Sequence, residues 1–264
     1  MATATLDRFI EVQNGRIRTR VFTAGSGDPI VFLHGAGGLT WDPFLDDLAA
    51  KFTVYAPEHP GSGTSQGLEH LDDLWDLVLY YYDLFDALGL KGVPVVGHSF
   101  GGMVTAELSA SNPDYVGKLV LISPIGLWRD DQPVQDWIGV SQEKLVKMVF
   151  AEPEGALAKQ MMTLPEEAEA KQMALFQMTM NLASTSQFCW PIPDKGLRKR
   201  IHRINQPTLI VWGNQDGLVP PVYAEEFRKR IPQAGVFMVE GAAHVPQLEQ
   251  RDLVSRAVLD FLAH

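Results

Sequence analysis

Residues 95–102 read VVGHSFGG, in which two β-branched residues run directly into Gly-His-Ser-Phe-Gly-Gly. The run VPVVG (93–97) is typical of a strand that is buried on both faces, and GGMVTAELSA (101–110) has the composition of a helix. A serine among glycines between a strand and a helix is the setting in which the backbone turns sharply and exposes one side chain. We therefore expect the Ser99 hydroxyl to stand clear of the strand, beside the N–H groups of the first helical turn.

Short apolar runs of the same kind recur along the chain, and segments with helical spacing lie between several of them. Runs without polar alternation are typical of strands that are covered on both sides, as in a parallel sheet. The pattern predicts a doubly wound, mostly parallel α/β sheet, preceded by a hairpin around Asn14-Gly15. The predicted strands are 30–33, 53–56, 93–97, 119–123, 208–212 and 236–240, and the predicted helices follow Leu71 and cover 102–111, 223–231 and 253–263.

The alternation of strand and helix breaks between residues 124 and 207, where no convincing strand pattern occurs. This stretch contains most of the nine methionines, and EKLVKMVFAE (143–152) and EAEAKQMALFQMTMNLA (167–183) have helical spacing. Its apolar content is too high for a linker. The sequence therefore predicts an α/β core formed by residues 1–124 and 208–264, with a helical insert at residues 125–207.

The composition is that of a globular protein with a sizeable core, with 46% hydrophobic and 20% charged residues. The net charge of −10 disfavours nucleic acids and anionic membranes as partners. We expect no secretory signal, because no apolar segment follows a basic start, and no membrane span, because no apolar run reaches about 18 residues. Cys189 is the only cysteine, which excludes internal disulfides and favours a reducing compartment, so we expect a cytoplasmic protein.

Two further polar residues follow predicted strands. Asp216 lies in GNQDGLVP after the strand at 208–212, and His244 lies in GAAHVPQLEQ after the strand at 236–240. The carboxyl ends of parallel strands meet at one edge of a sheet, where Ser99 is also expected. A serine hydroxyl becomes a nucleophile when a base removes its proton, and a carboxylate orients an imidazole base. The sequence therefore predicts a catalytic triad of Ser99, Asp216 and His244, and no metal-ligand spacing or cofactor motif accompanies it.

These features resemble the α/β-hydrolase family, whose triad follows the same order of nucleophile, acid and histidine. The resemblance covers nearly the whole chain. It rests on FLHGAGG (32–38), APEHPGSGTS (56–65), the glycine-rich turn at Ser99 and the segments that contain Asp216 and His244.

The resemblance implies an oxyanion hole, which is a pair of backbone N–H groups that bind the negative oxygen formed during acyl transfer. By position in the family motifs these are the N–H groups of Ala36 and Phe100. It also implies that the insert at 125–207 is a helical cap over the site, and that the reaction needs no cofactor.

Five other polar residues lie near these motifs and are not assigned to the triad. His98 is expected to pack or hydrogen-bond beneath the nucleophile, His34 is expected to brace the oxyanion loop, and His59 receives no role. Asp130 and Asp131 follow the sixth strand, which is an alternative position for the acid in some relatives. The later segment WGNQDGLVP (212–220) matches the family pattern and favours Asp216 as the acid of the triad.

The nucleophile narrows the reaction class, because dehalogenases and epoxide hydrolases of this family use an aspartate where this chain has Ser99. We expect a carboxylic-ester hydrolase that works through an acyl-enzyme. The main alternative is a carbon–carbon bond hydrolase of aromatic ring-cleavage products. Such enzymes usually carry a Gly-Gly-Gly-Pro-Gly loop and a tryptophan after the histidine, whereas this chain has HGAGG and Val245. A further alternative is a non-catalytic ligand receptor on a hydrolase scaffold.

The expected substrate is a small to medium, uncharged acyl or aryl ester. The methionines and aromatic residues of the insert predict an apolar, adaptable roof over Ser99. No cluster of basic residues marks the predicted strand ends, although Arg129 or Lys195 could lie close enough to bind an anionic group.

Overall fold

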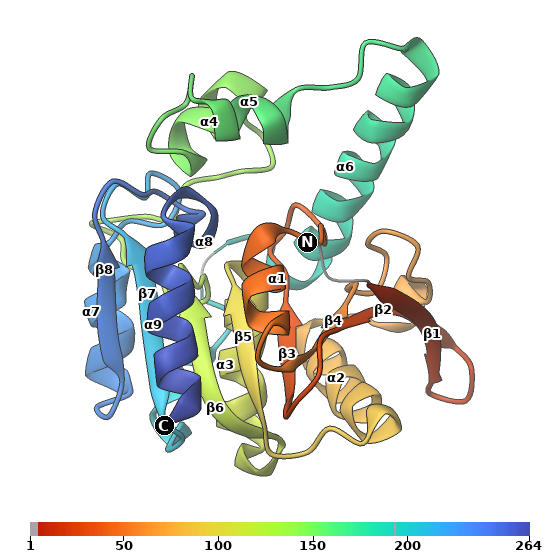
Figure 1. Cartoon of the computed structure of the whole chain (residues 1–264), viewed down its shortest axis with the longest axis vertical. Coiled ribbons are helices and arrows are strands. Elements are labelled where there is room, and N and C mark those ends of the chain that lie inside the picture. Colours follow the sequence, from red (N-terminus) through yellow and green to blue (C-terminus); the bar gives the residue numbers. More distant parts are fainter. Residues whose placement is uncertain (1–4, 193) are drawn as a thin grey trace.

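The computed structural model describes residues 5–192 and 194–264, so the first four residues and Pro193 of the predicted insert lie outside it. The described residues form an eight-stranded sheet with the order β1-β2-β4-β3-β5-β6-β7-β8 (Figure 1). The pairs β1–β2 and β2–β4 are antiparallel and the remaining pairs are parallel, which confirms the predicted α/β class. The strands are β1 (Leu6–Val12), β2 (Ile17–Ala24), β3 (Pro29–Leu33), β4 (Thr53–Pro57), β5 (Val93–His98), β6 (Val116–Ile122), β7 (Thr208–Gly213) and β8 (Gly235–Val239).

Helices cover both faces of the sheet. Side chains of α2, α3 and α7 share one apolar cluster with the sheet, and side chains of α1 and α9 share a second cluster on the opposite face. The helices are α1 (Pro43–Ala49), α2 (Leu74–Leu88), α3 (Phe100–Ser111), α4 (Gln142–Val149), α5 (Ala156–Met162), α6 (Ala168–Cys189), α7 (Val222–Arg230), α8 (Pro246–Glu249) and α9 (Arg251–Ala263), with short 3-10 turns at Leu68–His70, Pro113–Tyr115, Leu197–Lys199 and Ile201–Arg203.

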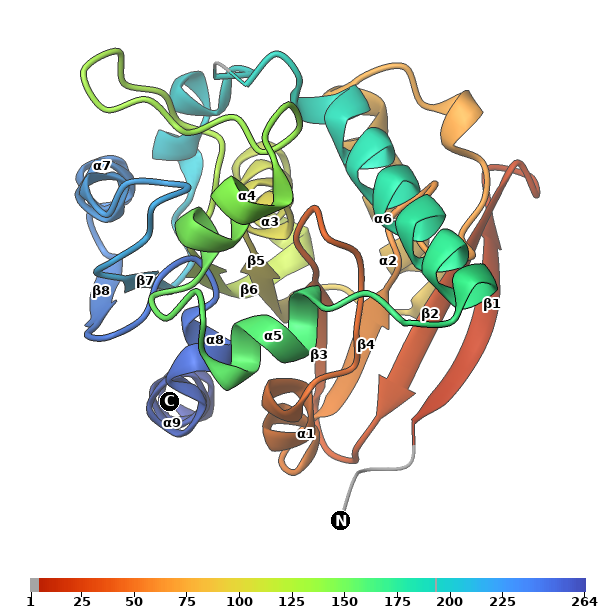
Figure 2. The same cartoon turned by 90° about the horizontal axis from the view of Figure 1, so that it is seen from above.

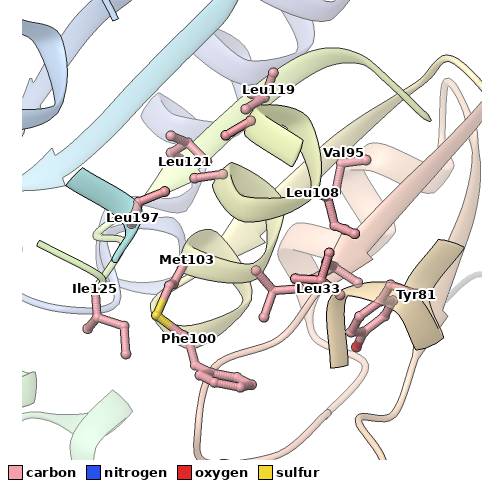
Figure 3. Packing of buried hydrophobic residues seen from close by; sticks show 14 of the residues in the cluster. Leu33, Tyr81, Val95, Phe100, Met103, Leu108, Leu119, Leu121, Ile125 and Leu197 are labelled. Atoms are coloured by element: carbon pink, nitrogen blue, oxygen red, sulfur yellow. The ribbon is translucent and has the colours of Figure 1, made fainter. Parts of the chain in front are cut away.

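The unbroken apolar runs of the central strands follow from this two-sided covering. Successive side chains of a strand point to opposite faces, so both sets must be apolar when both faces are covered. In β6, Leu119 and Leu121 join the cluster of α3, whereas Val120 and Ile122 join the cluster of α1 and α9. Figure 3 shows the first cluster, in which strand residues pack against side chains of α3.

Local signals in the sequence account for most element boundaries. The predicted hairpin forms, with Gln13, Asn14 and Gly15 in left-handed backbone conformations between β1 and β2. The helix expected after Leu71 begins at α2, where the Asp73 side chain accepts hydrogen bonds from two backbone N–H groups. The short helices α1 and α5 were not predicted, because seven residues are too few to show a clear helical period.

The segment between β6 and β7, residues 123–207, contains α4, α5 and α6 and no strand among its described residues. Figures 1 and 2 show α4 and α5 lying over the upper end of the sheet, and α6 leaning away from the body of the molecule. We call residues 123–207 the β6–β7 segment. Its position brings it next to the loops that leave the carboxyl ends of the strands.

The methionines of the β6–β7 segment, from which the sequence predicted an apolar roof over Ser99, differ widely in burial. Met148 is buried, but Met173 is 63% exposed and Met161 is 47% exposed. The reason is the direction of α6, whose buried residues all lie in its C-terminal half, from Asn181 onward. The first half of α6 extends from the molecule, so its side chains meet solvent on most sides (Figure 1).

Candidate active site

The turn between β5 and α3 holds Ser99 in a strained backbone conformation, with φ 53° and ψ −112°. Positive φ is uncommon for a residue with a side chain and costs on the order of 1–3 kcal/mol, so the surroundings must hold it in place. The Ser99 N–H donates to the Ile122 carbonyl at 2.9 Å, and its carbonyl accepts from Met103 N at 3.1 Å. These bonds to β6 and to the first turn of α3 fix the serine at the upper end of the sheet.

The glycines around Ser99 are required because neighbouring backbone passes very close. A Cβ on Gly101 would lie 2.1 Å from the Leu33 carbonyl oxygen, and a Cβ on Gly97 would lie 2.4 Å from the Gly101 carbonyl oxygen. Neither position can accept a side chain without moving the backbone. The sequence pattern of the turn therefore has a steric cause, and its consequence is that the Ser99 hydroxyl is directed away from the strand, towards His244.

The three predicted triad side chains form one hydrogen-bonded chain. His244 Nε2 lies 2.9 Å from Ser99 Oγ, and His244 Nδ1 lies 2.9 Å from Asp216 Oδ2. Because the carboxylate accepts the Nδ1 hydrogen, Nε2 is left with the lone pair that can accept the serine proton. All three residues are buried, which strengthens the electrostatic interaction among them.

The Asp216 carboxylate is fixed by the backbone of its own loop. Asp216 Oδ1 accepts hydrogen bonds from Leu218 N at 3.0 Å and from Val219 N at 2.8 Å, while Oδ2 faces the imidazole. A carboxylate that accepts several N–H groups cannot rotate without losing them. The loop after β7 therefore aims one carboxylate oxygen at His244.

The two backbone N–H groups predicted as an oxyanion hole belong to Phe100, which follows Ser99, and to Ala36, in the loop after β3. Phe100 is the first residue of α3, and within the described residues neither its N–H nor that of Ala36 donates to a protein acceptor. The loop before Ala36 is close to the nucleophile, because a Cβ on Gly35 would lie 3.3 Å from Ser99 Cβ.

Three histidines beside the site are neutral, of which His34 and His59 are buried and His98 is partly buried. Burial lowers the pKa of His98 to about 3, and the His98 Nε2 hydrogen is donated to the His244 carbonyl at 2.8 Å. Burial and the nearby His59 lower the pKa of His34 well below its usual range. The His34 ring donates from Nδ1 to the Gly35 carbonyl at 2.7 Å and accepts the His59 N–H at Nε2. His98 and His34 thus support the two loops next to the site, as their sequence positions suggested.

His59, which received no role from the sequence, links two parts of the core. Burial lowers its pKa to about 4, its Nε2 hydrogen is donated to the His34 carbonyl at 2.8 Å, and its Nδ1 contacts the Tyr81 hydroxyl. It also lies edge-on to the Phe100 ring, with ring centres 5.0 Å apart. His59 therefore holds the loop after β3 against α2 and α3.

Asn181 of α6, which no sequence motif identified, contacts the loops next to the site. Its Nδ2 donates to the Gly37 carbonyl at 2.9 Å, and its Oδ1 accepts from Ser62 Oγ at 2.9 Å and from Gly63 N at 3.2 Å. The side chain fills the space that a Cβ on Gly38 would occupy. Asn181 thus ties α6 to the loop that carries Ala36, although 144 residues of sequence separate it from Gly37.

Comparison with known proteins identifies the family of this chain. A model of the alpha/beta hydrolase family matches residues 30–257. The chain belongs to the alpha/beta hydrolase family.

Relatives of this hydrolase include two kinds of enzyme. It is 26% identical over 297 residues to a 2-hydroxy-6-oxo-6-phenylhexa-2,4-dienoate hydrolase of Burkholderia cepacia, covering 100% of this chain and 99% of that protein. It is 28% identical over 254 residues to a pimeloyl-[acyl-carrier protein] methyl ester esterase of Vibrio atlanticus, covering 90% of this chain and 95% of that protein. Its fold is similar to that of the meta-cleavage product hydrolase from Pseudomonas fluorescens IP01, with a TM-score of 0.79, 19% identity and 97% of each chain covered.

Arg129 and Lys195, the two basic residues that the sequence placed near the site, are hydrogen-bonded to other protein groups. Arg129 donates to Asp131 Oδ2 at 2.6 Å and to Glu226 Oε1 at 3.0 Å. Lys195 Nζ donates to the Trp190 carbonyl at 2.9 Å. The positive charge of Arg129 is therefore compensated by two carboxylates.

The alternative acids in the loop after β6, Asp130 and Asp131, do not take part in the hydrogen-bonded chain. Asp131 pairs with Arg129, and Asp130 accepts the indole N–H of Trp128 at 2.9 Å. The contact with the His244 ring is made by Asp216.

Within residues 5–192 and 194–264, no three His, Cys, Asp or Glu side chains gather in an arrangement that could hold a metal ion. The helices in the same part of the chain include none with the length and apolar character needed to cross a lipid bilayer.

Proposed function

We propose that this chain is a serine hydrolase that cleaves carboxylic esters through an acyl-enzyme. The observation that carries the proposal is the contact of His244 with both Ser99 Oγ and Asp216 Oδ2 at 2.9 Å. This is the arrangement in which a weak hydroxyl nucleophile gains a base, and the base gains a fixed orientation. In this proposal residues 1–124 and 208–264 are the catalytic core and residues 125–207 are its cap.

The first half of the reaction transfers the acyl group to the enzyme. Ser99 Oγ attacks the ester carbonyl carbon while its proton moves to His244 Nε2. The Asp216 carboxylate, held by two backbone N–H groups, stabilises the imidazolium that results. Collapse of the tetrahedral intermediate breaks the ester C–O bond, and His244 returns the proton to the departing alkoxide.

The second half of the reaction releases the acid. A water molecule gives a proton to His244 Nε2 and attacks the acyl-enzyme carbonyl. The second tetrahedral intermediate then breaks the bond to Ser99 Oγ, which regains its proton from the imidazolium. The net reaction converts ester and water into carboxylic acid and alcohol.

The negative oxygen of both intermediates is assigned to the backbone N–H groups of Ala36 and Phe100. Both donors belong to backbone that is fixed before substrate binds: Phe100 begins α3, and Asn181 and His34 hold the loop around Ala36. Preorganised donors need no rearrangement as charge develops, and one such donor is worth about 10²- to 10³-fold in kcat.

The proposed substrates are small to medium, uncharged acyl or aryl esters. The support for an uncharged substrate is the pairing of Arg129 with Asp131 and Glu226, which leaves its charge compensated. A dicarboxylate or phosphorylated ester would need a cation that is available to it.

The proposed setting is the cytoplasm, with a small-molecule ester as the partner and neither nucleic acid nor membrane involved. Cys189 is a free, buried thiol, which favours a reducing compartment. The net charge of −10 opposes contact with anionic polymers and anionic surfaces.

The second candidate is a carbon–carbon bond hydrolase of ring-cleavage products. It is favoured by the similarity to the dienoate hydrolase of Burkholderia cepacia, which spans 100% of this chain. The position after the histidine, Val245, packs in an apolar cluster with Phe150 and Ala158. This chain therefore has an aliphatic packing residue where such hydrolases usually carry a tryptophan.

One kinetic comparison separates the two candidates. We would measure kcat/KM for p-nitrophenyl butyrate and hexanoate, and for 2-hydroxy-6-oxo-6-phenylhexa-2,4-dienoate. The ester proposal expects the esters to be preferred. A dienoate preference above about tenfold, or ~1.4 kcal/mol of transition-state stabilisation, would make the carbon–carbon hydrolase the correct assignment.

A second experiment tests the nucleophile itself. A fluorophosphonate probe should label the parent protein at Ser99 and should not label Ser99→Ala, which should also lose ester turnover. Ser123→Ala is the matched control. Ser123 is a buried serine with positive φ at the end of the neighbouring strand β6, and its hydroxyl has no hydrogen-bond partner among the described residues. Labelling of Ser99→Ala, or its unchanged turnover, would overturn the proposal.

A further inference from the structure

The Glu249 carboxylate at the end of α8 bridges two segments that are far apart in the sequence. Its Oε1 accepts the Ala151 N–H at 2.7 Å, and its Oε2 accepts the Ala243 N–H at 2.6 Å. Ala151 belongs to the β6–β7 segment, and Ala243 directly precedes His244. A carboxylate can serve both donors because each of its oxygens is an acceptor.

The same stretch of the β6–β7 segment is hydrogen-bonded to the loops of both His244 and Asp216. The His244 N–H donates to the Val149 carbonyl at 3.0 Å, and the Gly217 N–H donates to the Met148 carbonyl at 3.0 Å. Gly217 lets the two segments approach closely, because a Cβ there would lie 3.1 Å from Met148 Cα. We call residues 148–151, which are the end of α4 and the two residues after it, the anchor segment.

An apolar cluster reinforces this contact on the other side of His244. Val245 packs with Phe150 of the anchor segment and with Ala158 of α5, and each of the three is at most 5% exposed. The backbone on both sides of His244 is therefore attached to the β6–β7 segment, by a hydrogen bond through Ala243 and Glu249 and by apolar contact through Val245.

We propose that Glu249 is a positioning residue that fastens the anchor segment to the His244 loop, so that the β6–β7 segment and the acid–base pair of the site are held as one unit. This inference deepens the proposed function and rests on it for the role of His244. The anchor segment supplies support that the sheet does not, since the backbone N–H groups of His244 and Gly217 both donate to it.

Glu249→Gln is the sharpest test, because the side chain keeps its size and loses one acceptor oxygen. The amide NH₂ then faces a backbone N–H that it cannot accept. The matched control is Glu240→Gln, which makes the same change at an exposed carboxylate four residues before His244, where the contact is to the Asn214 side chain. We expect kcat for p-nitrophenyl butyrate to fall about 10- to 100-fold in Glu249→Gln, with KM changed less than kcat. We expect Glu240→Gln to match the parent.

Amide hydrogen exchange of the folded proteins provides a readout that does not depend on activity. The amides of Ala151 and Ala243 donate to Glu249 and should exchange faster in Glu249→Gln whatever its role. The amides of His244 and Gly217 donate to the anchor segment instead, and the proposal expects them to exchange about tenfold faster as well. Glu249→Asp keeps the charge but is too short to reach both donors, so it should show the same pattern more weakly.

The outcomes separate this inference from the proposed function. If exchange rises only at Ala151 and Ala243, or if kcat is unchanged in both Glu249 variants, the coupling is absent and the inference is wrong. If Ser99→Ala retains ester turnover, the proposed function is wrong, and the exchange of His244 and Gly217 still decides whether Glu249 fastens the two segments.

Discussion

Replacing Asn181 should reduce catalysis more than it reduces stability. The side chain is 7% exposed and donates one hydrogen bond to Gly37, next to the proposed oxyanion donor Ala36. Its Oδ1 accepts from Ser62 and Gly63, which belong to the loop after β4. The variant Asn181→Ala removes all of these contacts, and Asn181→Asp removes only the donor to Gly37.

The loss of stability in Asn181→Ala depends on whether water can replace Asn181 at the groups that lose their hydrogen bond. Gly37 and Gly63 are exposed residues, so water can replace Asn181 at their backbone groups, whereas Ser62 is buried. A buried group that loses its partner costs about 1–3 kcal/mol, and a solvated one costs less. We expect Asn181→Ala to lower the free energy of unfolding by about 1–2 kcal/mol, measured by urea denaturation.

The catalytic cost is larger because the loop around Ala36 loses its link to α6. Complete loss of one oxyanion donor costs about 10²- to 10³-fold in kcat, which sets the upper limit. We expect a fall of about 10- to 100-fold in kcat for p-nitrophenyl butyrate in both variants. Asn181→Asp should lose at least as much as Asn181→Ala, because a carboxylate oxygen then faces the Gly37 carbonyl oxygen.

A transition-state analogue distinguishes an effect on the oxyanion donors from a general loss of structure. A trifluoromethyl ketone places a negative oxygen where the intermediate has one, so its affinity should fall with kcat while KM for the ester changes little. Gln177→Ala is the control, because it removes a neighbouring contact of Asn181 and leaves the bond to Gly37 in place. Normal kcat and inhibitor affinity in Asn181→Asp would refute the reasoning.

Three further predictions concern the core. Replacing Arg200 with Met leaves the buried Glu107 carboxylate without its two guanidinium hydrogen bonds, at 2.7 and 2.8 Å, and should lower the unfolding free energy by about 3 kcal/mol in urea. Glu107→Gln should cost less, and equal losses would contradict this reasoning. Burial lowers the pKa of His59 to about 4 and of His98 to about 3, so the unfolded chain binds more protons below pH 6.5. The unfolding free energy should therefore fall as pH drops from 6.5 towards 4, by up to about 1.4 kcal/mol per pH unit for each histidine, and urea midpoints that stay level from pH 7 to 5 would argue against it. Burial raises the pKa of the Cys189 thiol to about 12, so a disulfide reagent at pH 8 should modify only unfolded protein, and rapid reaction of the folded protein would show that the thiol is accessible.

The sequence by itself determined the fold class and the order of the strands along the chain. Apolar runs without alternation require a sheet covered on both faces, and the clusters on the two sides of β6 have this origin. The glycine pattern around Ser99 could be recognised because it has a local steric cause. Asp216 and His244 could be proposed because each directly follows a strand, and parallel strands end at a common edge.

The tertiary structure alone decided what holds these residues in position. Asn181 and Glu249 contact segments about 100 residues or more away, and no local period or motif identifies such partners. Both contacts depend on how the β6–β7 segment folds back over the sheet, and the direction of α6 likewise left methionines exposed that composition had placed over the site. Hydrophobic periodicity records which side of an element is buried, but the partner of a buried amide or carboxylate is chosen by packing between distant parts of the chain.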